Sequence, residues 1–194
     1  MLRKIPLAAL AILGHSLYLD DDETLPNMRK GLIPPEGKVW RGSTIPREHG
    51  LRWTKGVDPN AFEERYGLPL SIYKSYRSTT NVRIRDAEVK WIEEGGILKY
   101  SIQLDKYGEF ADGSRDDEII NYAKAIKAVE PHQVMVLPGF EPDLYVTELR
   151  KGKPNLKYKG TPEEYRLAFR RFFDVFRDEG VENAVWALDY SWDI

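Results

Sequence analysis

The sequence predicts an α/β protein with a parallel sheet, and within that class an incomplete (β/α)8 TIM barrel that holds about five of the eight β/α units. From residue 39 onward, short apolar runs typical of strands alternate with amphipathic helical segments. Such alternation indicates parallel strands joined by right-handed crossovers. An open doubly wound sheet fits the same order, but it usually carries a G-x-G-x-x-G phosphate loop after its first strand. Residues 41–46 read Arg-Gly-Ser-Thr-Ile-Pro, with one glycine, which favours the barrel.

The first sixteen residues have the features of a probable signal peptide. Residues 2–4 (Leu-Arg-Lys) are basic, residues 5–13 are apolar, and Gly14-His15-Ser16 gives a small-x-small cleavage pattern. The alternative is a buried first helix or strand. The apolar run is too short for a membrane span, which takes about 20 residues. We therefore expect a secreted or extracytoplasmic protein in which residues 17–37 form an extended lead-in and residues 38–194 form the partial barrel domain.

Five strands and four helices are expected in alternating order. Runs rich in branched, aromatic and other apolar residues predict the strands, at residues 39–42, 70–75, 97–104, 133–137 and 184–188. Apolar residues at helical spacing predict the helices, near 59–66, over 84–92, from Ser114 to before Pro131, and from Thr161 to Gly180. We expect Ser114 to cap the third of these helices. The fourth has the clearest ends, because Thr161, Pro162 and Glu164 form a capping box and Gly180 provides a stop.

Composition argues against several classes of function. The chain has 29 basic and 31 acidic residues, interspersed, and a formal net charge of -2, whereas a nucleic-acid-binding domain usually has a basic face. There is no cysteine, and the three histidines are scattered, so we expect neither a metal site nor a cofactor. Aromatic residues reach 12%, which suits either a packed core or a sugar-binding cleft, since a pyranose ring offers an apolar face.

The connection after strand 133–137 is the most informative for function. It runs to Gly160, about twenty residues, where a βα connection usually has 2–6. Glu141 stands just past the strand end, at the side of a barrel where active sites lie. Glycoside hydrolysis needs two carboxyl groups, one of which protonates the leaving oxygen. Glu141 is therefore a candidate proton donor, and a solvated loop glutamate is the alternative.

Other polar and aromatic residues follow strands on the same side and are candidates for lining a sugar cleft. Ordinary loop polarity or core packing is the alternative for each of them. The candidates for substrate binding are Tyr76, Asp105, Tyr107, Asp143, Tyr145 and Trp186, with Asp189 and Tyr190 after the last strand.

Five segments carry a resemblance to a known family. They are 95–98 (GGIL), 113–119 (GSRDDEI), 140–143 (FEPD), 165–171 (YRLAFRR) and 183–186 (NAVW). From Leu70 to Asp189 the chain resembles glycoside hydrolase family 26, the family of many endo-β-1,4-mannanases. The family's His-Glu-Met-Asn after strand four, which carries the acid/base glutamate, is Phe140-Glu141-Pro142-Asp143 here. The changed neighbours, Phe140 and Asp143, bear on how well a sugar would be held for cleavage.

The resemblance implies a retaining hydrolase of a mannan-like β-linked polysaccharide, with residues 38–194 as part of the catalytic domain. The family's nucleophile lies at the end of strand seven, and no residue of this chain matches it. We therefore expect the chain to be the N-terminal portion of a longer barrel and to contain only the acid/base half of the mechanism. The alternatives are a non-catalytic carbohydrate-binding protein on the same scaffold and, third, a structural or interaction protein.

Overall fold

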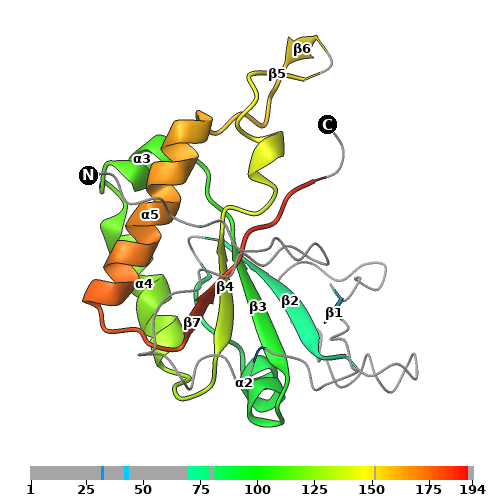
Figure 1. Ribbon diagram of the computed structural model, residues 1–194, viewed down its shortest axis with the longest axis vertical. Coiled ribbons are helices and arrows are strands. Elements are labelled where there is room, and N and C mark those ends of the chain that lie inside the picture. Colours follow the sequence, from blue (N-terminus) through cyan, green and yellow to red (C-terminus); the bar gives the residue numbers. More distant parts are fainter. Residues whose placement is uncertain (1–31, 33–41, 44–69, 79–80, 151, 192–194) are drawn as a thin grey trace, which may run out of the picture.

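A computed structural model of the chain describes residues 32, 42–43, 70–78, 81–150 and 152–191 (Figure 1). The expected signal peptide, the helix near 59–66 and, apart from Leu32, the lead-in lie outside the described residues.

The described strands form one parallel sheet in which spatial order follows chain order. Its strands are β1 (Gly42–Ser43), β2 (Ile72–Arg77), β3 (Ile97–Ile102), β4 (Val134–Pro138) and β7 (Ala184–Trp186). The order is β1-β2-β3-β4-β7, and each neighbouring pair is parallel. A doubly wound sheet reverses its order at a switch point, and no such reversal occurs among the described strands. The described strands therefore form a parallel α/β sheet in chain order, as successive β/α units do.

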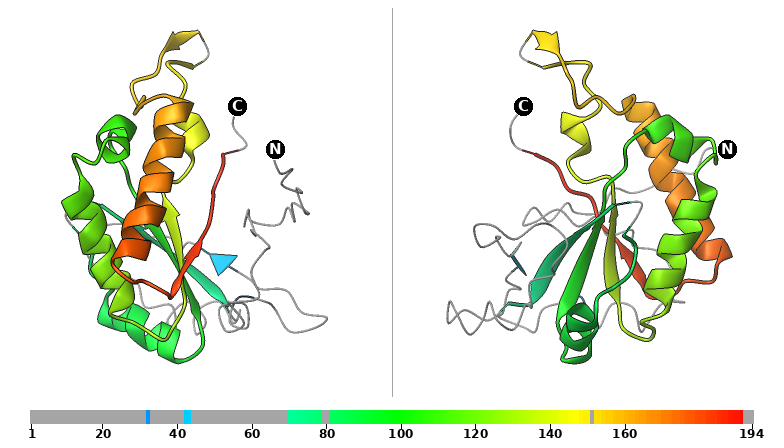
Figure 2. Two further views of the ribbon diagram at one scale, coloured as in Figure 1. Left: turned by 60° about the vertical axis from the view of Figure 1, so that its left-hand side comes forward. Right: turned by 180° about the vertical axis from the view of Figure 1, so that it is seen from behind.

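The helices between these strands are α2 (Asp86–Glu93), α3 (Tyr107–Ala111), α4 (Asp116–Lys127) and α5 (Pro162–Asp178). In Figures 1 and 2, α3, α4 and α5 form a layer on one face of the sheet. The carboxyl ends of the strands point toward the 3-10 helix η1 (Pro142–Leu144) and the hairpin of β5 (Leu149–Arg150) and β6 (Lys153–Pro154). Right-handed crossovers on one side are what consecutive β/α units require. A membrane-spanning helix would have to be long and apolar, and none of the helices in the described residues is both.

The two faces of the sheet differ because side chains alternate along each strand. Leu98, Tyr100 and Ile102 of β3 are buried against the helices, in a core that includes Ile119, Ile126 and Phe172. We call the opposite face the inner face; in β2 and β3 it carries, in order, Ile72, Lys74, Tyr76, Ile97, Lys99 and Ser101. A smaller apolar cluster lies on it, formed by Leu32, Ile97, Met135, Leu137 and Ala187.

One charged network is buried between β2 and α2. The Arg77 guanidinium pairs with the Glu88 carboxylate, and both side chains have 1% or less of their surface exposed. The Ser75 hydroxyl also donates to Glu88, at 2.6 Å. Because buried charges are costly unless paired, this network fixes how α2 sits on the sheet.

The helix ends show what the sequence predicts well and where it fails. For α5 the capping box is present: the backbone N–H of Glu164 donates to the Thr161 hydroxyl, and the Glu164 side chain accepts from Thr161 N–H. The prediction that Ser114 caps α4 is wrong. The N-cap is Arg115, and the Ser114 hydroxyl donates to Asp112 instead, at 2.6 Å. Acidic residues in the first turn of α4 interact favourably with the positive end of the helix dipole. They stabilise the start of the helix although no side chain caps it.

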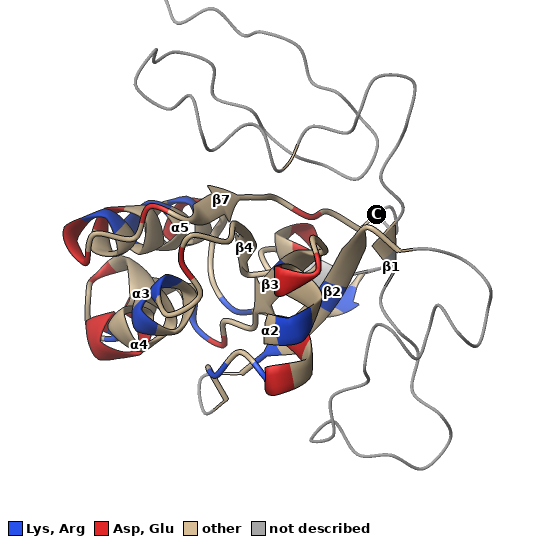
Figure 3. Ribbon diagram, turned by 90° about the horizontal axis from the view of Figure 1, so that it is seen from below, with Lys and Arg blue, Asp and Glu red and all other residues tan. Residues whose placement is uncertain are grey.

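Four elements were absent from the expectation. Helix α3 follows β3 directly, and the long connection after β4 contains a 3-10 helix η1 (Pro142–Leu144) and a small antiparallel hairpin of β5 (Leu149–Arg150) and β6 (Lys153–Pro154). Strand β2 also begins and ends two residues later than expected. Residues of both charge signs occur on the helix layer (Figure 3), which offers no face of a single sign among the described helices.

Candidate functional site

The backbone after β4 turns sharply and brings Glu141 to the carboxyl-end edge of the sheet. Gly139 has φ 67° and Glu141 has φ 50°, both in the left-handed region that side chains disfavour. A Cβ on Gly139 would lie 2.9 Å from the Tyr165 ring, so glycine is required there. The Glu141 N–H donates to the Asp189 carbonyl at 3.1 Å. Glu141 is therefore held between the ends of β4 and β7 in a conformation that costs free energy.

Asp143 connects the same two segments through its side chain. Its carboxylate oxygens accept from the Ser191 backbone N–H at 3.0 and 3.2 Å. A carboxylate engaged in this way fastens the segment after β7 to η1. The structure thus gives Asp143 a positioning role at the edge of the site.

Three aromatic rings gather beside Glu141. The Phe140 ring centroid lies 5.1 Å from that of Tyr76 and 6.3 Å from that of Tyr145, both in edge-to-face contact. Burial raises the pKa of Tyr145, and the charges of Glu141 and Tyr76 raise it further. We define Tyr76, Phe140 and Tyr145 as the aromatic cluster. The Glu141 carboxylate lies near enough to Tyr145 for its charge to raise the pKa of that hydroxyl.

Two lysines lie next to the aromatic cluster on the inner face. Lys74 of β2 and Lys99 of β3 are register partners on adjacent strands. Both ammonium groups reach the same Asp189 oxygen, at 2.5 Å from Lys74 and 3.4 Å from Lys99. We call Lys74, Lys99 and Asp189 the ion triad. Burial opposes ionisation of Asp189, but the two lysines outweigh it and lower the pKa of its carboxyl group.

A third lysine approaches the aromatic cluster from the long connection. The Lys159 ammonium lies 3.9 Å from the Tyr145 ring centroid and 5.9 Å from that of Phe140, distances at which a cation is attracted to a ring face. Burial lowers the pKa of Lys159. The carboxyl-end edge therefore combines aromatic surface, one strained glutamate and several partly buried cations.

Two of the expected cleft residues lie elsewhere, and their assignment to the cleft is corrected. Tyr107 is fully buried at the start of α3, with its ring 5.1 Å from that of Tyr165. Trp186 lies on the helix side of the sheet, where its ring packs against those of Phe169, Phe173 and Phe176. Each belongs to the packing between sheet and helices, because strand alternation and the unexpected helix α3 turn them away from the inner face.

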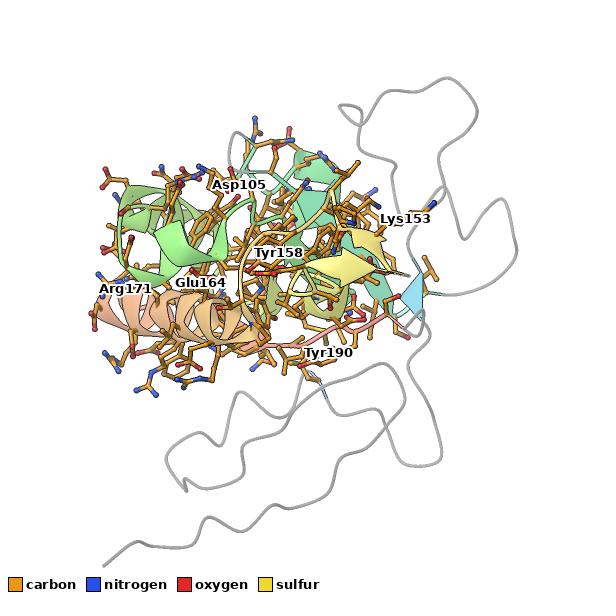
Figure 4. The ribbon with its side chains drawn as sticks, turned by 90° about the horizontal axis from the view of Figure 1, so that it is seen from above. Asp105, Lys153, Tyr158, Glu164, Arg171 and Tyr190 are labelled. Carbon is orange, nitrogen blue, oxygen red and sulfur yellow. The ribbon has the colours of Figure 1, made fainter. Side chains whose placement is uncertain are left out.

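The other expected residues lie at or near the edge. Tyr76 and Tyr145 belong to the aromatic cluster, and Asp189 to the ion triad. Asp105 is exposed and pairs with Arg115 at 3.5 Å, and Tyr190 is 44% exposed. Figure 4 looks onto the carboxyl-end edge and shows Asp105 and Tyr190 on opposite sides of it, with Tyr158 in the region between. Asp105 is thus at the margin, apart from the aromatic cluster.

Sequence reasoning missed Lys74, Lys99 and Lys159. The alternation within β2 contained a signal for the first, since Lys74 shares its face with Ile72 and Tyr76. A lysine on an otherwise apolar strand face needs a partner, but the distant Asp189 could be identified only from the fold. Within the described residues, no group of three or more His, Asp or Glu side chains is arranged to hold a metal ion.

Comparison with known proteins supports the fold at the level of architecture. No family model matches the sequence, and none of the curated proteins matches it. Among solved structures, the chain is similar to the GH26 domain of PbGH26-GH5A, an endo-beta-mannanase/endo-beta-glucanase from Prevotella bryantii, with a TM-score of 0.52 and 12% identity. The match covers 67% of this chain and 53% of that one, so the chain spans about half of that domain. At this identity, the likeness shows a shared α/β fold.

Proposed function

We propose that the protein is a glycoside hydrolase acting on a β-linked, mannan-like polysaccharide, with Glu141 as the general acid/base. The observation that carries the proposal is the position of Glu141: a strained glutamate at the carboxyl end of the fourth strand, beside the aromatic cluster. Catalytic residues of barrel enzymes come from the carboxyl ends of the strands. Non-glycine residues in the left-handed region cluster at functional sites.

In this proposal each part of the edge has a task. The rings of Phe140, Tyr76 and Tyr145 supply apolar surface for a sugar's C–H face. The Glu141 carboxyl group protonates the glycosidic oxygen as the bond breaks and then, as a carboxylate, accepts a proton from the attacking water. Retaining hydrolysis also needs a second carboxylate about 5–5.5 Å from the first. The family resemblance assigns that nucleophile to strand seven of the barrel, and β7 is the fifth strand of this sheet.

A non-catalytic carbohydrate-binding protein is the second candidate, and one observation favours it. Asp143, which replaces the asparagine expected from the resemblance, is occupied by the Ser191 N–H. Phe140, which replaces the histidine, is packed between two tyrosines. Neither residue is arranged to hold a sugar hydroxyl near the cleaved bond. The aromatic surface proposed to bind the sugar ring is kept in both cases.

The test measures hydrolysis and binding separately. Because the resemblance places the nucleophile on strand seven of the barrel, reducing-sugar release from β-mannan is followed for a form of the protein that extends through that strand and for the same form with Glu141→Gln, which keeps the side-chain shape and removes the titratable proton. Binding of β-1,4-mannotriose to the same two proteins is measured by titration calorimetry. Asp178→Asn is the matched control, because Asp178 is an exposed acid at the C-terminal end of α5, in the helix layer.

The hydrolase proposal predicts a loss of at least a hundredfold in reducing-sugar release for Glu141→Gln, a typical contribution of general acid–base catalysis. Mannotriose affinity should change less than threefold, and Asp178→Asn should retain activity. Binding without hydrolysis in either protein would favour the non-catalytic candidate. Equal hydrolysis by both proteins would remove Glu141 from the mechanism.

A further inference from the structure

The ion triad holds more positive than negative charge. Lys74 and Lys99 face one carboxylate, that of Asp189, and both pair with the same oxygen atom. Their side chains are 15% and 14% exposed, so water compensates little of the excess. Burial acts to lower the pKa of Lys74, but its pairing with Asp189 outweighs burial, so this pKa is raised. The pKa of Lys99 is lowered, first by burial and then by the charge of Lys74. Of the two, Lys99 is the less well compensated.

The Phe140 ring lies next to the ammonium groups of both Lys74 and Lys159. The Lys74 ammonium lies 5.8 Å from the Phe140 ring centroid and 4.9 Å from that of Tyr76. The Lys159 ammonium lies 5.9 Å from the Phe140 centroid, and among the described residues Lys159 has no salt bridge to a carboxylate. The rings are thus bordered by partly buried ammonium groups on strands β2 and β3 and on the long connection.

This combination has a specific chemical complement. Partly buried cations that lack a full set of counter-charges are stabilised by an anionic ligand, through charge-assisted hydrogen bonds. The rings of the aromatic cluster supply apolar surface that suits the C–H face of a sugar. A uronic acid residue has both features, because its ring carries a carboxylate in place of the C6 hydroxymethyl group. A neutral hexose would add no counter-charge to the one carboxylate that pairs with both lysines among the described residues.

We propose that the inner face at Lys74 and Lys99 binds the carboxylate of a uronic acid residue, so that the ligand is an acidic β-linked saccharide. This rests on the proposed function only for the location of the sugar site. It changes the expected class of saccharide from neutral mannan to a polyuronate or a polysaccharide bearing uronic acid residues.

A matched pair of ligands tests the proposal. A β-1,4-linked mannuronate trisaccharide and β-1,4-mannotriose differ only at C6, and binding of each to the full chain is measured by titration calorimetry. We expect the mannuronate to bind about ten- to hundredfold more tightly, the range for a hydrogen bond to a charged group. Acetate, the third ligand, should bind at least tenfold more weakly than the mannuronate. Equal affinities for the two trisaccharides would overturn the proposal, and acetate binding as tight as mannuronate would overturn its saccharide part.

Lysine variants show whether the preference arises at the ion triad. Lys99→Met removes the charge and keeps the unbranched stem apart from its last atom, and we expect it to abolish most of the preference for mannuronate. Lys74→Met should reduce it as well, and circular dichroism checks that each variant is folded. Lys90→Met is the control, because Lys90 is 63% exposed on α2 and pairs with Glu94. An unchanged preference in folded Lys99→Met and Lys74→Met would show that the triad only joins the strands, contradicting the proposal.

The readout is independent of hydrolysis. Glu141→Gln should keep the preference for mannuronate even if it abolishes cleavage. If mannuronate preference is found without any hydrolysis, the anion site stands and the hydrolase proposal fails. If mannan is hydrolysed and mannuronate binds no more tightly than mannotriose, the hydrolase proposal stands and the anion site fails.

Discussion

Replacing Glu141 by glycine should make the protein more stable while removing the group proposed to act on substrate. Glu141 has φ 50° and ψ 49°, and a non-glycine residue in this region costs about 1–2 kcal/mol. Glycine avoids that cost but loses more chain entropy on folding, about 0.5–1 kcal/mol. The expected net gain in unfolding free energy is therefore about 0.5–1 kcal/mol. For a chain of this size that corresponds to a rise in Tm of about 1–4 °C.

Urea unfolding and thermal melts measure this effect, with two controls. Glu141→Gln keeps the strained backbone and should leave stability unchanged. Glu148→Gly replaces an exposed glutamate of the same connection whose φ is not positive, and it should lose about 0.5–1 kcal/mol. The reasoning is refuted if Glu141→Gly is no more stable than the parent protein, or if both glycine substitutions have the same sign.

Three further predictions concern the frame around the site. Glu88→Gln leaves the buried Arg77 charge without a counter-charge, so the free energy of unfolding in urea should fall by about 3–5 kcal/mol; a loss below 1 kcal/mol would show that the pair is not buried in solution. Thr161→Ala removes the side-chain cap of α5 and should cost about 1 kcal/mol, whereas Ser114→Ala should cost less, because Ser114 caps no helix. The pKa of Asp189 is lowered in the folded protein. Its contribution to stability is therefore present above the usual aspartate pKa of 3.8 and is lost as the pH falls through the lower pKa of the folded state. Asp189→Asn should flatten the dependence of stability on pH below about 4, and an unchanged slope would contradict the ion triad.

The elements that the sequence predicted well are those whose signals are local. The capping box of Thr161 and Glu164 needs only residues three apart, and helix α5 begins where it indicates. The alternation of strands and helices gave the parallel sheet, although β2 is shifted and α3 and the β5–β6 hairpin were not anticipated. Short elements are set by tertiary packing: Tyr107 is buried by its contact with Tyr165, 58 residues away in the chain.

The candidate site was predictable in part, for the same reason. Glu141 and Tyr145 follow a strand end closely, so the barrel rule places them correctly at the edge. Trp186 was ambiguous because strand alternation alone does not tell which face is inner. The pairing of Lys74 and Lys99 with Asp189 joins residues 115 and 90 positions apart. Such a contact depends on the order of strands, which periodicity does not provide.

We propose that a saccharide binds at the carboxyl-end edge of the sheet, around Glu141 and the aromatic cluster. Two-dimensional NMR of the chain during titration with β-1,4-linked trisaccharides tests it without requiring catalysis. The largest backbone amide shifts are expected at Tyr76, Phe140, Glu141 and Tyr145. Shifts confined to α2 and α4 on the opposite side of the sheet, with none at those four residues, would contradict it.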